Sequence, residues 1–241
     1  MFDILFAYIF SIYGNEYGCK MIKKIDILGI QLDNYTVREA IMRVEAWYDN
    51  NMLNVIEMVS MQMLTESESD PVLKEVISSL DLAVIGEKGI LQAAGVDTMQ
   101  RIRETEKKDF SDEFLKRVER NRKSVFIIGE TQGAVDEFTQ ELREEYPKLV
   151  LAGAAATENC VGDLEGVINE MNAATPDVII SIIPSPGQEH FLVEHRDKIN
   201  ANLWYGIGGF EVHRKRSRIK GFFWNLIHRV RLKNSIEKYE S

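Results

Sequence analysis

Cysteine and histidine are scarce in this sequence, and their scarcity excludes two classes of protein. The 241 residues include two cysteines, Cys19 and Cys160, and four histidines. Two cysteines do not make a disulfide framework, and the histidines lack a metal-binding spacing such as HExxH. We therefore expect a reduced, cytosolic protein that needs no metal ion and no other cofactor.

Long hydrophobic runs are missing as well. The apolar stretch at residues 4–13 is shorter than the roughly twenty residues that a membrane-spanning helix needs, and it lacks the basic leader of a signal peptide. Met21 begins the first segment with strand character. Residues 1–20 are therefore either an extension that precedes the true start or a hydrophobic segment that touches the membrane.

Positive charge is sparse in most of the chain and concentrated at its end. Residues 1–212 hold 20 basic and 36 acidic side chains, whereas residues 213–241 hold nine basic and two acidic ones, a net charge of +7. The basic residues adjoin Phe222, Phe223 and Trp224, a combination typical of segments that lie on anionic lipid. RNA binding would use similar chemistry, but the acidic body would repel nucleic acid and no nucleic-acid-binding module is recognisable. A docked C-terminal helix with a solvated basic face is the third alternative.

Strands and helices alternate through the middle of the sequence. Residues 123–129 are a short apolar run rich in β-branched side chains, residues 134–142 carry apolar positions at helical spacing, and residues 149–153 are a second apolar run. Such a strand, helix and strand close as a parallel crossover. Gly129 ends the first strand, where open α/β sheets bind ligands, although a glycine there is more often part of a simple turn.

Further elements extend this pattern along the chain. Strands are expected within residues 24–33, 53–59, 81–85, 176–183 and 203–209, and helices after Thr36, after Ser60, around 164–171 and through His195. Residues 97–122 are highly charged and weakly periodic, so no element is assigned to them. The alternation predicts an α/β protein: a Rossmann-like α/β/α sandwich with a largely parallel sheet over residues 21–212, followed by a basic appendage at residues 213–241.

Short motifs in this order resemble the WecB/TagA/CpsF family of bacterial glycosyltransferases. No single motif is decisive, but their order and spacing cover residues 25–231, which chance would rarely produce. They are Ile27-Leu-Gly-Ile-Gln-Leu-Asp-Asn34, Asp70-Pro71, Ser124-Val-Phe-Ile-Ile-Gly129, Pro176-Asp-Val178, Ser185-Pro-Gly-Gln-Glu189 and Gly206-Ile-Gly-Gly209.

The resemblance implies a metal-independent enzyme of the bacterial surface. Such an enzyme transfers an N-acetylmannosamine-type or glucose-type sugar from a UDP-sugar to a polyprenyl-diphosphate-linked acceptor, in the synthesis of surface polysaccharide or teichoic acid linkages. It implies a peripheral position at the inner face of the cell membrane, and it is compatible with a homo-oligomer. The basic residues expected at the membrane or at the acceptor diphosphate are Arg214, Arg216, Arg218, Lys220, Arg229 and Arg231.

The resemblance also suggests where the donor binds, at the carboxyl ends of the strands. Gln188 and Glu189 match the family's position for polar recognition of the nucleotide or sugar, although Glu189 also suits the positive end of a helix dipole. Paired glycines after the last strand permit close approach of a ligand, or only close packing. The expected substrate-binding set is Ser60, Gly86, Gly129, Gln188, Glu189, Gly208 and Gly209.

Three family motifs are altered in this chain. Met58-Val-Ser60 replaces a Thr-x-Asn motif, and the charged run at residues 104–109 has no clear match to an Arg-Val-x-Gly-x-Asp segment. Gly86 stands where the family's Pro-Asp-Gly-x-Gly motif has its proposed catalytic aspartate. Glu87, one residue along, is either a displaced general base or a solvated glutamate that pairs with Lys88. The alternative function is therefore a catalytically impaired homologue that acts as a binding or regulatory partner in polysaccharide assembly.

Overall fold

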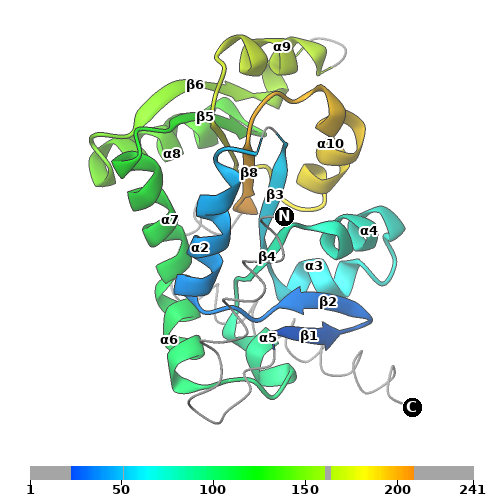
Figure 1. Cartoon of the computed structure of the whole chain (residues 1–241). Coiled ribbons are helices and arrows are strands. Elements are labelled where there is room, and N and C mark those ends of the chain that lie inside the picture. The colour runs from blue at the N-terminus through cyan, green and yellow to red at the C-terminus, as the bar shows by residue number, and fades with distance from the viewer. Residues whose placement is uncertain (1–22, 51, 161–163, 209–241) are drawn as a thin grey trace.

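A computed structural model of the chain describes residues 23–50, 52–160 and 164–208. Its centre is a sheet of six parallel strands in the order β4-β3-β8-β7-β5-β6, with helices on both faces (Figure 1). β1 (Lys24–Ile27) and β2 (Ile30–Asp33) form a separate antiparallel hairpin. The predicted α/β/α sandwich with a parallel sheet is confirmed. The predicted segments 1–20 and 213–241 lie outside the described residues.

The strands of the sheet are apolar on both faces, because helices cover both. Their β-branched side chains suit the pleated backbone, and continuous burial removes the alternation that a half-exposed strand would show. The strands are β3 (Asn54–Val59), β4 (Leu82–Ile85), β5 (Ser124–Gly129), β6 (Val150–Ala156), β7 (Val178–Ser181) and β8 (Leu203–Gly206). Each of these segments was predicted, and the last two strands are shorter than expected.

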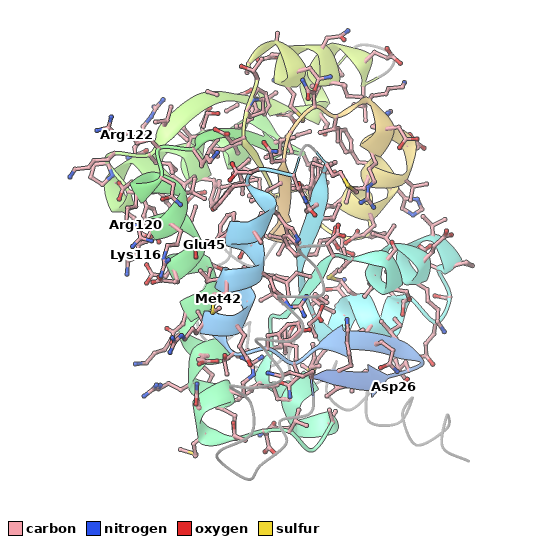
Figure 2. The ribbon with its side chains drawn as sticks, viewed as in Figure 1. Asp26, Met42, Glu45, Lys116, Arg120 and Arg122 are labelled. Atoms are coloured by element: carbon pink, nitrogen blue, oxygen red, sulfur yellow. The ribbon has the colours of Figure 1, made fainter. Side chains whose placement is uncertain are left out.

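One face of the sheet is covered by three helices, α2 (Val37–Trp47), α7 (Asp109–Arg120) and α8 (Gln132–Glu145). Thr36 begins α2 with the predicted capping box: its hydroxyl accepts a hydrogen bond from the Glu39 N–H, and the Glu39 carboxylate accepts one from the Thr36 N–H. Glu45 of α2 forms ion pairs with Arg117 and Arg120 of α7 at the surface. Figure 2 shows Glu45 and Arg120 on these neighbouring helices.

The opposite face of the sheet is covered by the hairpin and by five of the helices in the described residues. The hairpin packs with α3 (Met61–Glu66), α4 (Pro71–Ser79) and α5 (Lys88–Ala93) over the β3 and β4 end of the sheet. α9 (Glu165–Ala173) and α10 (Gly187–His195) cover β5, β7 and β8. Two short 3₁₀ turns, η1 (Thr157–Asn159) and η2 (Arg196–Lys198), complete the connections.

Residues 97–122 hold two helices that the sequence analysis did not assign. They are α6 (Met99–Lys107) and α7, separated by Lys108 in a left-handed conformation with a φ of 56°. α7 is a strongly amphipathic helix, because Phe110, Phe114 and Val118 recur every four residues and are buried. The charged residues between them occupy the solvent face and hide this narrow apolar stripe in the sequence.

No helix in the described part of the chain is long and apolar enough to cross a bilayer.

Candidate functional site

Several predicted site residues lie at one edge of the sheet, because parallel strands all end on the same side. Ser60, Gly86 and Gly129 follow or end β3, β4 and β5. The backbone continues the strand ladder just beyond this edge: the Gly86 N–H donates to the Val59 carbonyl at 2.9 Å, and the Ile182 N–H donates to the Ile128 carbonyl at 2.8 Å. The carboxyl edge is also where open α/β sheets bind ligands.

Ser60 and Gly129 have structural roles at this edge. The Ser60 hydroxyl caps α3 by accepting a hydrogen bond from the Met63 N–H at 3.0 Å. A Cβ atom on Gly129 would lie 2.7 Å from Val135 Cγ2 and 3.0 Å from Ile182 Cγ1, so this glycine permits close packing of α8 on β5. These contacts favour the simple-turn interpretation of Gly129 over phosphate binding.

A buried polar cluster lies over the end of β8, and it includes two predicted site residues. Gln188 and Glu189 come from the first turn of α10, and both are almost completely buried. A Cβ atom on Gly206 would lie 2.7 Å from Gln188 Cδ, so the amide occupies space that only glycine leaves open. Glu57 of β3 is paired in register with Gly206 and is also fully buried. Sequence reasoning missed Glu57, although a carboxylate within an otherwise apolar strand was a usable signal.

Burial dominates the electrostatics of this cluster. It raises the pKa of the Glu57 carboxyl well above its ordinary value, and the nearby Glu189 charge raises it further. Burial also raises the pKa of Glu189. The Gln188 amide is close enough to oppose the rise in pKa of both carboxyls. Among the described residues, however, no well-aligned hydrogen bond reaches either carboxyl, and Gln188 Oε1 has no partner. Such a cluster favours protonated, neutral carboxyls.

Glu87 is half-buried at the start of α5. The sequence allowed two interpretations of it, a displaced general base or a solvated glutamate that pairs with Lys88, and the structure contradicts the second. Lys88 forms an ion pair with Glu106 of α6, so the predicted pairing of Glu87 with Lys88 is wrong. Burial raises the pKa of Glu87, and a hydrogen bond from the Met61 backbone N–H partly opposes that rise. A half-buried carboxyl with a raised pKa is closer to a general base than to a solvated loop glutamate.

A small hollow lies beside the carboxyl ends of β3 and β4, on the opposite face from the Gln188 cluster. Its volume is about 30 Å³, and Met58, Val84 and Arg101 are among the residues that line it. Arg101 is buried, donating to Asn34 Oδ1 at 3.1 Å and to Glu104 Oε2 at 2.8 Å. Sequence reasoning missed Arg101, because nothing in the charged run around it distinguishes a buried arginine from a solvated one.

Gly208 is the last described residue, and its φ of 62° lies in the left-handed region that favours glycine. Gly209 and the six predicted basic residues between Arg214 and Arg231 lie outside the described residues. Within the described ranges, no group of three or more histidine, cysteine, aspartate or glutamate side chains is arranged to hold a metal ion.

The parallel sheet, with polar side chains gathered at its carboxyl edge, defines a Rossmann-like α/β protein. Residues 25–213 match the model of the glycosyl transferase WecG/TagA/CpsF family, and the chain belongs to this family. It is similar to the N-acetylglucosaminyldiphosphoundecaprenol N-acetyl-β-D-mannosaminyltransferase of Staphylococcus aureus strain NCTC 8325, with 23% identity over 191 residues, which cover 77% of this chain and 73% of the relative. The protein of the same name from strain MRSA252 is 22% identical over the same length.

Proposed function

We propose that this chain transfers an N-acetylmannosamine-type or glucose-type sugar from a UDP-sugar to a polyprenyl-diphosphate-linked acceptor. Family membership makes it a glycosyltransferase, and the similar staphylococcal proteins are named for transfer to N-acetylglucosaminyldiphosphoundecaprenol. The observation that carries the proposal is Gln188, which lies in the family motif at the carboxyl edge with a buried, unpartnered amide oxygen. A donor bound at the carboxyl edge would lie against the first turn of α10, which positions this side chain.

The reaction needs one group in this chain to accept a proton. The acceptor hydroxyl attacks the anomeric carbon, the bond from that carbon to the diphosphate oxygen breaks, and UDP leaves with the bonding electrons. The hydroxyl proton passes to a general base, for which Glu87 is our candidate. Its raised pKa suits this role, because a base is most effective when its pKa approaches the working pH.

Donor binding tests the proposal directly. Calorimetric titration with UDP-N-acetylmannosamine, UDP-N-acetylglucosamine and UDP-glucose is expected to give saturable binding of at least one of them. Gln188→Ala should weaken that binding by about tenfold, the value of roughly one hydrogen bond. Gln140→Ala, on the exposed face of α8, is the matched control and should leave the affinity unchanged. The proposal is wrong if none of the three donors binds.

One observation favours the alternative function, a catalytically impaired homologue that acts as a binding or regulatory partner. The hollow beside Met58 and Arg101 has a volume of about 30 Å³, and ligand pockets usually measure about 300–1,000 Å³. Arg101 is also engaged with Glu104 and Asn34. Because so small a hollow leaves no room for a nucleotide sugar, failure of every UDP-sugar to bind would support this function.

The basic appendage is expected to hold the enzyme at the membrane. Removal of residues 213–241 takes away a net charge of +7 together with Phe222, Phe223 and Trp224. Each cation near an anionic surface contributes about 1 kcal/mol. A chain cut after Val212 should therefore stay folded by circular dichroism but no longer sediment with vesicles that contain anionic lipid. Equal sedimentation of the two chains would contradict the proposal.

A further inference from the structure

One row of residues crosses the sheet beneath the first turn of α10, and its character changes there. Glu57, Gly206 and Ser181 are paired in register on β3, β8 and β7, so these three positions face the same side of the sheet. The row continues into apolar residues on β4 and β5. We call the three central positions the Gln188 socket.

The side chain of Gln188 fills this socket. A Cβ atom on Gly206 would lie 2.7 Å from Gln188 Cδ and 2.8 Å from Gln188 Oε1, so the amide lies over the space that glycine leaves open. Glu57 is the neighbour of Gly206 on the adjacent strand, about 4.8 Å away. Its carboxyl is close enough for the Gln188 amide to affect its pKa. Glu57 and Gln188 are therefore side-chain neighbours in a place that water does not reach, since both are almost completely buried.

Both members of this pair have spare hydrogen-bonding capacity. Glu57 Oε1, Glu57 Oε2 and Gln188 Oε1 are buried and have no partner among the described residues. Burial raises the pKa of Glu57 and so favours its protonated form, which has one O–H donor as well as an acceptor oxygen. A carboxylic acid and a primary amide are complementary: the acid O–H donates to the amide oxygen, and an amide N–H donates to the acid carbonyl oxygen. Rotation about the side-chain torsions is enough to form this pair.

We propose that Glu57 is a positioning residue, which pairs as a neutral acid with the Gln188 amide and thereby fixes the first turn of α10. The inference rests on the proposed function, in which the donor lies against this turn. Glu57 itself does not touch the donor, because it is fully buried within the sheet. Without the acid, the Gln188 amide would be left buried and unsatisfied, and the turn would have to shift to bring it to water.

Titration of the full-length chain with UDP, the part that the three donors share, tests the positioning role. Glu57→Leu is expected to weaken binding about tenfold, and Glu57→Leu/Gln188→Ala no more than Gln188→Ala alone, because both changes break one pair. Glu57→Gln can still form two hydrogen bonds with Gln188 and should restore the affinity to within about twofold of the wild type. Val55→Ala, which truncates a core residue on the same strand and face, is the control and should leave UDP affinity unchanged. Losses that multiply to about a hundredfold in the double variant would overturn the proposal.

A measurement without any ligand separates this inference from the proposed function. The NMR signals of the Gln188 side-chain NH₂ group, assigned by their loss in Gln188→Ala, are expected to be protected from exchange with water in the wild type and in Glu57→Gln. In Glu57→Leu their protection should fall by about tenfold or more. Unchanged protection in Glu57→Leu would overturn the positioning role, even if UDP binds. Loss of protection in Glu57→Leu together with no binding of UDP or any UDP-sugar would support the pairing and overturn the proposed function alone.

Discussion

Replacing Glu57 with glutamine is expected to flatten the pH dependence of stability above about pH 4.5. Glu57 is fully buried beside Glu189, and the pKa values of both carboxyls are raised in the folded protein. The folded state therefore keeps protons that the unfolded chain releases above the ordinary value of 4.5. The free energy of unfolding should fall as the pH rises from there through the raised pKa values, by up to about 1.4 kcal/mol per pH unit for each titrating carboxyl.

The sign of this effect distinguishes Glu57 from an ordinary paired glutamate. A carboxylate with a lowered pKa stabilises a protein more as the pH rises, whereas Glu57 should do the opposite. Glutamine keeps the shape of the side chain and cannot ionise, so Glu57→Gln should gain stability relative to the wild type as the pH rises. Urea unfolding between pH 5 and pH 8 measures this difference.

The control for this prediction is Glu75→Gln, which removes an exposed carboxylate from α4 on the same face of the sheet. Its stability profile should run parallel to that of the wild type. A Glu57→Gln profile that is also parallel would contradict the prediction.

Replacing Glu87 with glutamine is expected to reduce turnover by about 10²-fold without weakening donor binding. The amide keeps the size of the side chain but cannot accept the proton of the acceptor hydroxyl. Wild-type turnover should rise with pH as Glu87 loses its proton, at a pH above the ordinary value because burial raises its pKa. Steady-state transfer to a polyprenyl-diphosphate-linked acceptor measures both effects.

Two further variants sharpen the test of Glu87. Glu106→Gln removes the partner of Lys88, the residue next to Glu87, and should leave turnover nearly unchanged if proton transfer belongs to Glu87. Gly86→Asp places a carboxylate at the family's position for the aspartate. We expect at most partial gain, because Met58 and Ser60 still replace the threonine and asparagine of the Thr-x-Asn motif and residues 104–109 do not match the family segment. Normal turnover in Glu87→Gln would refute the displaced-base hypothesis.

The element pattern was largely predictable because it depends on short-range features. The apolar runs of β3, β5 and β7 and the capping box at Thr36 are local, and the structure has them where the sequence placed them. α7 was missed because its apolar residues are separated by charged ones. Their common face becomes evident only when they pack against Tyr205 and the rest of the core.

By itself, the sequence determined the order of the strands, most of the helices between them, the family and the uneven distribution of charge, because these follow from neighbouring residues and from residue types. Tertiary structure alone decided which distant side chains meet. α10 places Gln188 over Gly206 and buries Glu57 beside Glu189, and α6 brings Glu106 to Lys88. Sequence spacing cannot reveal such contacts, because they depend on how each helix packs on the sheet. The raised pKa values of Glu57 and Glu87 have the same origin, since burial is a property of the packed molecule.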